Sequence, residues 1–310
     1  PWFGTTKNVV DRYPEAGNSL PGTVHTYVWA DGSQRGRFPS NDNAWWTYDS
    51  TTKQLLIGTT FQDASHSTTV TETAYTAFLD EVPEGTTEQP WLDVIEGGNG
   101  RFNVKSIVVK AGSNFYATNL YKWFHHYEAV TSITVTGLKL AGTENLESLF
   151  EGCYELTSIS GLASLDVSGA TSLARMFAED RKLTEITGVS AWDTSSVTDL
   201  SDLCYNDYSM LRLVDLGNWN TSAVTDFSNA FYNNSSLTTL DLHNWDMRAS
   251  VEPASPAAGV TYSRAHMLKL CDGSSFTTVA LTSLKLGPNA ILADTDFDDA
   301  LLTRKPTDGS

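Results

Sequence analysis

The chain has 310 residues, of which 40% are hydrophobic and 18% are charged, so it is a globular protein and not a disordered one. Its formal net charge of −17 makes nucleic acids and anionic membrane surfaces poor partners, because both need clustered lysine and arginine. No apolar run approaches the roughly 18 residues that a membrane-spanning helix needs, so we expect no membrane insertion.

Residues 1–103 are predicted to form a small β-rich domain. Residues 23–30 alternate in the manner of a strand and then meet Asp31-Gly32, which is typical of a strand that runs into a turn. AWWTYD from Ala44 and QLLIG from Gln54 flank the polar residues STTK, which predicts a β-hairpin with a loop of four residues or slightly more.

The same region also carries a helix signal. Thr69 and Glu72 have the spacing of a capping box, and Tyr75 and Phe78 follow at helical spacing. Residues 69–82 are therefore predicted to form a short helix that Pro83 ends.

Two interpretations of the aromatic residues Trp29, Trp45, Trp46 and Tyr48 stay open. Exposed aromatic side chains would form a platform on which sugar rings stack, with Trp45 and Trp46 as the candidate ligand-binding residues. Aromatic residues also favour half-buried strands, and in that case at least half of the four belong to the core of a small sheet.

From residue 104 onward two apolar patterns recur together. Apolar residues at positions 0, 3 and 5 of a strand recur every 26 to 28 residues with one interval of 44, starting at Val104, Val130, Leu156, Leu183, Leu211, Leu237 and Leu281. A second apolar pair keeps the same phase, at Trp123-Phe124, Leu149-Phe150, Met176-Phe177, Leu203-Cys204, Ala230-Phe231 and Met267-Leu268. A period of this length indicates stacked repeats, each of which buries its apolar face only against a neighbour.

We therefore predict an α+β fold built on a leucine-rich-repeat-like solenoid with a parallel β-sheet and short helices. Residues 104–290 form the solenoid, residues 1–103 form a β-rich cap on its first strand, and residues 291–310 form an acidic C-terminal tail. Trp192, Trp219 and Trp245 are expected to stack inside it.

A column of short polar residues and cysteines follows the second apolar pair in each repeat. We expect its side chains to satisfy backbone groups at the bend between repeats; they are Tyr127, Cys153, Asp180, Asp207, Asn234 and Cys271. The three cysteines lie too far apart in this register to form a disulfide, so all are expected to be reduced and buried.

The repeats WDTSSVTDLSDL, NWNTSAVTDFSNAFYNNSSLTTLDLHNWDM and LESLFEGCYELTSI resemble the BspA-type leucine-rich-repeat family of bacterial surface proteins. The resemblance covers residues 44–286, although the repeat from Leu156 lacks the tryptophan and the repeat from Leu237 is interrupted. It implies an extracellular, cell-surface protein whose role is adhesion or host interaction. It implies no catalytic residues.

Two places break the uniformity of the repeats. RASVEPASPAAG, Arg248–Gly259, accounts for most of the long interval, and it is either a binding loop or a tolerated surface insertion. Small polar residues dominate the solvent-facing side of the predicted sheet, and larger residues cluster at one end of it. These larger residues are candidate ligand-binding residues: Leu213, Asp215, Asp241 and His243. The alternative is that this face of the sheet is only solvated.

Catalytic and metal-binding motifs are largely missing from the sequence. His125 and His126 would point about 100° apart on a helix, which disfavours a shared metal. DTDFDD from Asp294 lacks the glycine and the final glutamate of a calcium loop. We therefore expect no metal, no cofactor and no enzymatic activity.

Three functions remain open. The first is a non-catalytic adhesion or recognition module that binds a host or matrix protein or a glycan, and the second is a structural spacer on the cell surface. The third is a polysaccharide-acting enzyme, for which Asp215 and Asp241 on neighbouring repeats would have to act as a carboxylate pair.

Overall fold

A computed structural model gives the structure of the chain. It describes residues 7–11, 25–29, 33–38, 41–58, 76–79, 95–109, 114–117, 119–136, 138–140, 144–213, 215–271 and 279–292. The DTDFDD segment and nearly all of the predicted acidic tail lie outside the described residues.

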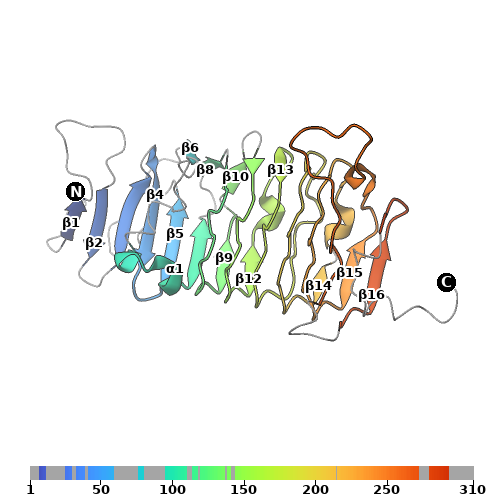
Figure 1. Cartoon of the computed structure of the whole chain (residues 1–310). Coiled ribbons are helices and arrows are strands. Elements are labelled where there is room, and N and C mark those ends of the chain that lie inside the picture. Colours follow the sequence, from blue (N-terminus) through green and yellow to red (C-terminus); the bar gives the residue numbers. More distant parts are fainter. Residues whose placement is uncertain are drawn as a thin grey trace.

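The fold combines a mixed parallel and antiparallel sheet with very little helix, and its strands follow one another along an elongated molecule (Figure 1). The largest sheet has eight strands in the order β1 (Lys7–Asp11), β2 (His25–Trp29), β3 (Gln34–Phe38), β4 (Asn41–Asp49), β5 (Gln54–Gly58), β7 (Ser106–Val109), β9 (Ser132–Thr134) and β12 (Ser158–Ser160).

Three smaller sheets accompany it. One consists of β14 (Arg212–Leu213), β15 (Thr239–Leu242) and β16 (Ser283–Leu286), and another of β10 (Leu138–Leu140), β8 (Asn114–Ala117) and β6 (Thr76–Leu79). The third pairs β11 (Glu144–Asn145) with β13 (Ala170–Ser172).

The helices are single turns: η1 (Ile95–Gly97), α1 (Gly100–Asn103), η2 (Leu162–Ser164), η3 (Asp215–Asn218) and η4 (Arg248–Ser250). Among the described residues, no helix is long and apolar enough to cross a membrane.

The predicted N-terminal hairpin is confirmed. β4 and β5 pair antiparallel from Asp49 opposite Gln54 to Trp45 opposite Gly58, so the loop is STTK. Oδ1 of Asp49 accepts hydrogen bonds from the N–H groups of Thr51 (2.8 Å) and Thr52 (2.9 Å), which closes the turn.

The predicted helix over residues 69–82 is wrong where the structure describes it. Thr76–Leu79 is strand β6, which pairs in parallel with β8. A capping pattern is a local signal worth little free energy, and the hydrogen bonds of a neighbouring strand override it here. The other residues of that range lie outside the described part.

From β5 onward the main sheet becomes parallel, and β9 and β12 each enter one sequence repeat after the strand before them. Ile57 pairs with Val109, and Ile107, Ile133 and Ile159 lie side by side on consecutive strands. Ile107 and Ile133 are buried, as the apolar pattern predicts, whereas Ser158 and Ser160 face solvent.

The repeat in the second sheet begins one residue earlier than the sequence pattern predicts. Leu213 pairs with Leu240, so the counterpart of Leu237 is Met210 and not Leu211. Met210 is buried, whereas 44% of Leu211 is exposed. Both residues are apolar, so the pattern alone did not separate the two registers, and a shift of one residue exchanges the two faces of a strand.

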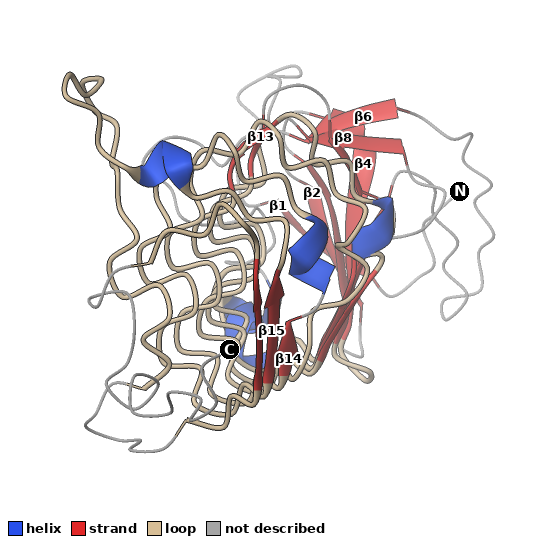
Figure 2. Ribbon diagram, turned by 90° about the vertical axis from the view of Figure 1, so that its right-hand side faces the viewer, coloured by secondary structure: helices blue, strands red, loops and turns tan. Residues whose placement is uncertain are grey.

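The far side of each repeat is a series of turns that stack on one another (Figure 2). Alternate N–H groups donate to the next repeat, as from Phe124 to the Leu149 carbonyl (2.9 Å) and from Phe150 to the Met176 carbonyl (3.0 Å). The rings of Phe124, Phe150 and Phe177 stack with centroids 5.9 and 5.7 Å apart. The apolar pairs therefore form one continuous buried column.

The predicted tryptophan column is confirmed. Trp192, Trp219 and Trp245 are buried and nearly parallel, with centroids 5.8 and 6.4 Å apart. Each indole N–H donates to a carbonyl of the preceding repeat: those of Leu162, Val189 and Leu216, at 2.9, 2.9 and 2.8 Å. The indoles thus fill the interior and also satisfy backbone groups there.

Candidate binding surfaces

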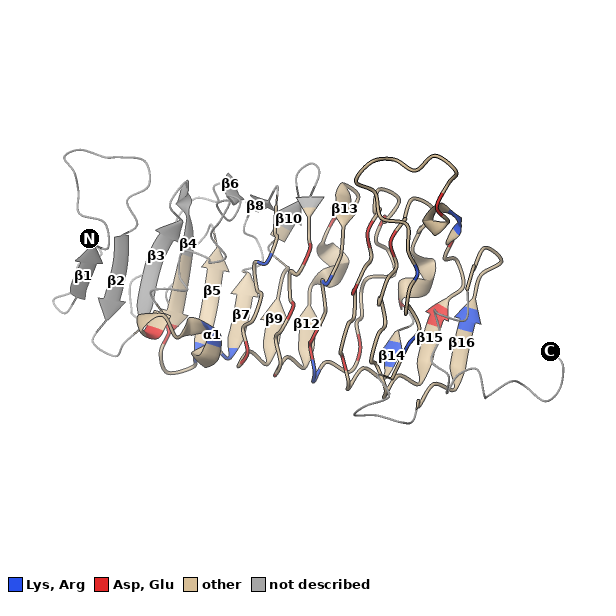
Figure 3. Ribbon diagram, viewed as in Figure 1, with Lys and Arg blue, Asp and Glu red and all other residues tan. Residues whose placement is uncertain are grey.

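The sheet end predicted from the sequence is built around one buried carboxylate. Asp241 on β15 lies 2.6 Å from Nδ1 of His243 through Oδ1, and its Oδ2 accepts a 2.8 Å hydrogen bond from Nζ of Lys285 on β16. Figure 3 shows the acidic position on β15 beside the basic one on β16. The Asp241 side chain is 10% exposed, whereas His243 and Lys285 are 45% and 64% exposed. This end therefore presents the side chains of His243 and Lys285 to solvent as a rim around the buried carboxylate.

Local packing fixes this arrangement. Burial pushes the pKa of Asp241 upward, but hydrogen bonds from Lys285 and His243 outweigh it and hold the pKa below its ordinary value. Gly217 on η3 lies against the pair, and a Cβ there would be 2.7 Å from Nδ1 of His243 and 2.9 Å from Oδ1 of Asp241. A side chain at position 217 would therefore displace the cluster.

Two of the predicted sheet-end residues are placed differently from the expectation. Leu213 was expected to face solvent, but it is buried opposite Leu240, because the register is shifted by one residue. Asp215 lies on η3 and accepts a 2.7 Å hydrogen bond from the N–H of Gly188. The register of β14 and β15 places Asp215 level with Leu242 and not with Asp241, so the two aspartates do not occupy the equivalent positions that the carboxylate-pair hypothesis assumed.

The predicted aromatic platform loses two of its four members, Trp46 and Tyr48. Trp46 is fully buried in the core beside Tyr48, because alternate residues of β4 point into the molecule. The side chains of Trp29 and Trp45 lie outside the described part. Trp46 and Tyr48 therefore belong to the core interpretation.

The insertion is a second exposed feature. All residues from 251 to 260 are exposed, including Val251 at 49% and Val260 at 41%. The base of the loop is fixed, because Nε of Arg248 donates to Asp246 at 3.0 and 3.1 Å and Nη1 of Arg264 donates to Ser250 at 2.8 Å. In Figure 1 the orange segment around residue 250 runs as a long loop along the upper edge of the molecule.

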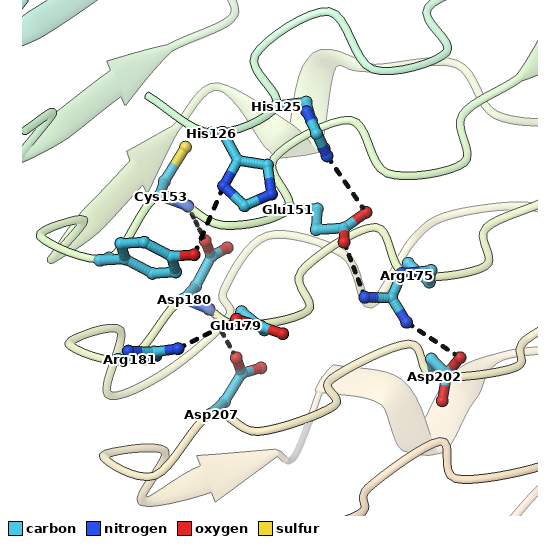
Figure 4. Close-up of polar contacts among 11 residues, drawn as sticks. His125, His126, Glu151, Cys153, Arg175, Glu179, Asp180, Arg181, Asp202 and Asp207 are labelled. Atoms are coloured by element: carbon cyan, nitrogen blue, oxygen red, sulfur yellow. Dashed lines mark hydrogen bonds and ion pairs between the residues drawn. The ribbon is translucent and has the colours of Figure 1, made fainter. Parts of the chain in front are cut away.

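A third cluster, which the sequence analysis did not predict, lies on the stacked turns (Figure 4). Nε2 of His125 lies 3.8 Å from Oε2 of Glu151, and Oε1 of Glu151 accepts a 2.7 Å hydrogen bond from Arg175. Arg175 also donates to Asp202 at 3.2 Å. The rings of His125 and His126 are 4.1 Å apart at their centroids. Four consecutive repeats thus contribute to one polar network.

Burial dominates the electrostatics of this cluster. It lowers the pKa of His125 to about 4, with a smaller contribution from the neighbouring His126. Burial also pushes the pKa of Glu151 upward, but the Arg175 hydrogen bond outweighs it and leaves the pKa below its ordinary value. At neutral pH the cluster therefore contains an uncharged imidazole and an ionised carboxylate.

The assumption that His125 and His126 lie on a helix, with side chains that point about 100° apart, was wrong. Residues 121–126 form turns and not a helix, and His126 has a φ of 57°. The sequence did hold the necessary signal, because Glu151 follows the apolar pair Leu149-Phe150 just as His125 follows its own pair. Equivalent positions in adjacent repeats lie side by side.

Comparison with known proteins gives one match. Residues 118–259 match a family model described as a Mycoplasma protein of unknown function, DUF285. No curated protein and no solved structure matches the chain. The matched range includes the tryptophan column, the His125 cluster and the whole insertion Arg248–Gly259, and the family is described as one of unknown function.

Proposed function

We propose that this protein is a non-catalytic recognition module of a bacterial cell surface, which binds a host or matrix protein or a glycan. We further propose that its repeats form a leucine-rich-repeat-like solenoid of the BspA type. The repeat motifs that resemble that family, the parallel register of β7, β9 and β12, and the stacked aromatic columns support this architecture.

The residues of the most specific motif have structural roles, which supports a protein that does not catalyse a reaction. In the two VTD motifs, Oδ1 of Asp199 accepts from the Ser201 N–H and Oδ1 of Asp226 accepts from the Ser228 N–H, both at 2.8 Å. The hydroxyl of Thr198 donates to the carbonyl of the preceding repeat at 3.1 Å. These side chains satisfy backbone groups at turns, so the motif needs no chemical function to explain it.

The observation that carries the proposal is the exposed loop at residues 251–260, which overlaps the insertion Arg248–Gly259. Two exposed valines in this ten-residue loop present apolar surface to water, which is unfavourable. Hydrogen bonds made by Arg248 and Arg264 hold the two ends of the loop in place. Loops held by a rigid scaffold are the usual place for recognition residues. We therefore assign the main contact to this loop and a secondary one to the rim of His243 and Lys285.

A binding experiment with matched variants tests this proposal. The parent chain, the double variant Val251→Ser/Val260→Ser and the control Leu211→Ser would be applied to an array of glycans and host matrix proteins. Leu211 is a suitable control because it is an exposed apolar residue on a different surface. We expect the double variant to lose at least about tenfold in affinity for the partner that the parent binds, which corresponds to about 1.4 kcal/mol.

The control should bind as well as the parent, and all three proteins should melt at similar temperatures, because exposed substitutions change stability little. Unchanged binding by the double variant would place the contact elsewhere. If the parent binds nothing on the array, the spacer function replaces recognition, and a polysaccharide shortened by the protein would contradict the non-catalytic assignment.

A further inference from the structure

We propose that His125, His126 and Glu151 form a site for one divalent transition-metal ion of the zinc class. Each of these residues offers one ligand atom, and the three atoms lie within 4.8 Å of one another. They come from two consecutive repeats, so a bound ion would link the turn at residues 119–127 to the turn at residues 145–153.

The spacing suits a small four-coordinate ion. Bonds of about 2.0–2.1 Å to nitrogen and oxygen place tetrahedral ligands roughly 3.3 Å apart. Nε2 of His125 and Oε2 of Glu151 are 3.8 Å apart. A closure of a few tenths of an ångström therefore brings this pair to the coordination distance.

The carboxylate is already oriented for such a role. Arg175 donates to Oε1 of Glu151 at 2.7 Å and to Asp202 at 3.2 Å, so the guanidinium holds one carboxylate oxygen and leaves Oε2 directed at His125. Outer partners that fix a ligand in this way are a regular feature of metal sites. Arg175 is thus a positioning residue for the site.

The second imidazole is positioned by what surrounds it. A Cβ at Gly152 would lie 2.7 Å from Nδ1 of His126, so the absence of a side chain there lets the ring lie over the next repeat. The Tyr154 hydroxyl is 3.4 Å from the same Nδ1, which leaves Nε2 as the ligand atom. Gly152 also has a φ of 75°, a conformation that suits glycine.

A separate observation indicates that the His125 ring lacks a protein partner. Its Nδ1 is buried without a hydrogen-bond partner in the described part of the chain, and its Nε2 is beyond hydrogen-bond distance from Glu151. A buried imidazole is ordinarily hydrogen-bonded or coordinated. A metal ion between His125 and Glu151 would supply the interaction that Nε2 lacks, whereas Nδ1 would not be a ligand.

The donor set selects the class of ion. Two imidazole nitrogens and one carboxylate oxygen suit Zn²⁺, Co²⁺ or Ni²⁺, whereas Ca²⁺ and Mg²⁺ take all-oxygen sites. Three protein ligands also leave one position open for water or for a group from a partner.

Titration of the tag-free, chelator-treated chain with ZnCl₂ in a calorimeter tests the proposal, together with visible spectra after Co²⁺ addition. Glu151→Gln and His126→Asn remove one ligand each, and His266→Gln is the matched control because His266 is an exposed histidine two or more repeats away. We expect one ion per chain, a higher melting temperature with zinc, and the intense d–d bands of tetrahedral Co²⁺.

Each ligand variant should weaken zinc binding at least tenfold and lose the Co²⁺ bands, while His266→Gln should behave as the parent. Metal-free melting temperatures of the variants establish that they are folded; His126 is only half-buried, so His126→Asn remains informative if the Glu151 variant unfolds. No zinc binding by the parent, binding unchanged in both ligand variants, or equal loss in His266→Gln would overturn the site.

Discussion

The backbone N–H of Asp180 donates a 2.8 Å hydrogen bond to Oδ1 of Asp207, which occupies the same position in the next repeat. Oδ1 of Asp180 in turn accepts a 3.0 Å hydrogen bond from the N–H of Cys153. Both carboxyl groups are fully buried, and their Oδ2 atoms have no hydrogen-bond partner in the described part of the chain. Burial, joined for Asp180 by the nearby Asp207, raises the pKa of both groups well above the ordinary value.

This ladder predicts that the protein becomes less stable as the pH rises. A carboxyl group with a raised folded pKa holds more protons in the folded state, so its contribution is complete below the unfolded value of about 3.9 and is lost as the pH rises through the folded pKa. Denaturant unfolding at pH 5.5 and pH 8 should therefore give a lower free energy of unfolding at pH 8.

Asparagine in place of Asp180 or Asp207 should reduce the loss of stability at high pH. Asn234 already occupies the same column, and its Nδ2 donates to the carbonyl of Cys204 at 2.6 Å. We expect Asp180→Asn and Asp207→Asn to raise the free energy of unfolding at pH 8 by about 1–3 kcal/mol each and to flatten its pH dependence. The exposed Asp193→Asn is the control and should change neither. Destabilisation of both buried variants at pH 8 would contradict this account of the ladder.

The tryptophan column predicts a large and separable effect at Trp219, which stacks between two other indoles. Trp219→Ala should lower the free energy of unfolding by about 3–5 kcal/mol because it leaves a cavity. Trp219→Phe retains a ring but leaves the Val189 carbonyl without its 2.9 Å donor, which should cost about 1–3 kcal/mol. Equal losses in both variants, measured by urea unfolding, would show that the indole hydrogen bond alone determines the effect.

Removal of the N-terminal strands should abolish cooperative folding. β5 covers the edge of β7 in parallel register, and Ile107 and Val109 on β7 are fully buried. A fragment of residues 104–310 exposes that edge and should aggregate or melt without a sharp transition. A fragment of residues 41–310 keeps the β4 and β5 hairpin and should still melt sharply. A sharp melt of the shorter fragment would remove the need for a cap.

The cysteines should be reduced and unreactive in the folded protein. All three are buried and none forms a disulfide, and burial raises the pKa of the Cys153 and Cys204 thiols. The Cys153 thiol also donates to the Phe124 carbonyl at 3.2 Å. Alkylation should be slow in buffer and complete in denaturant. A mass two hydrogens lower for the unreduced protein would reveal a disulfide and contradict the register of the repeats.

The sequence predicted the interior better than the surface. The buried columns were predictable because Phe124, Phe150 and Trp219 recur with the period of the chain, and identical positions in stacked repeats must meet. The start of the repeat at Met210 was missed because Leu211 is also apolar, so hydrophobicity could not decide between two registers that differ by one residue.

The candidate sites were harder to predict because they depend on conformation. The His125 cluster relies on turns in which His126 adopts a positive φ, and a helical interpretation of the same residues separates their side chains. The buried state of Asp241 depends on Lys285, which lies 44 residues further along the chain. The pairing of Asp241 with Lys285 can be predicted only when the insertion between them is known to be a loop outside the stacked repeats.

Hydrogen–deuterium exchange of the chain, alone and bound to the partner found on the array, tests the proposed recognition function most directly. The exposed loop at residues 251–260 has little secondary structure of its own, so its amides should exchange rapidly in the free protein. Binding through this loop predicts protection concentrated in peptides that cover residues 248–262. Protection confined to the outward face of β9 and β12, with the loop still exchanging at its free rate, would contradict the assignment.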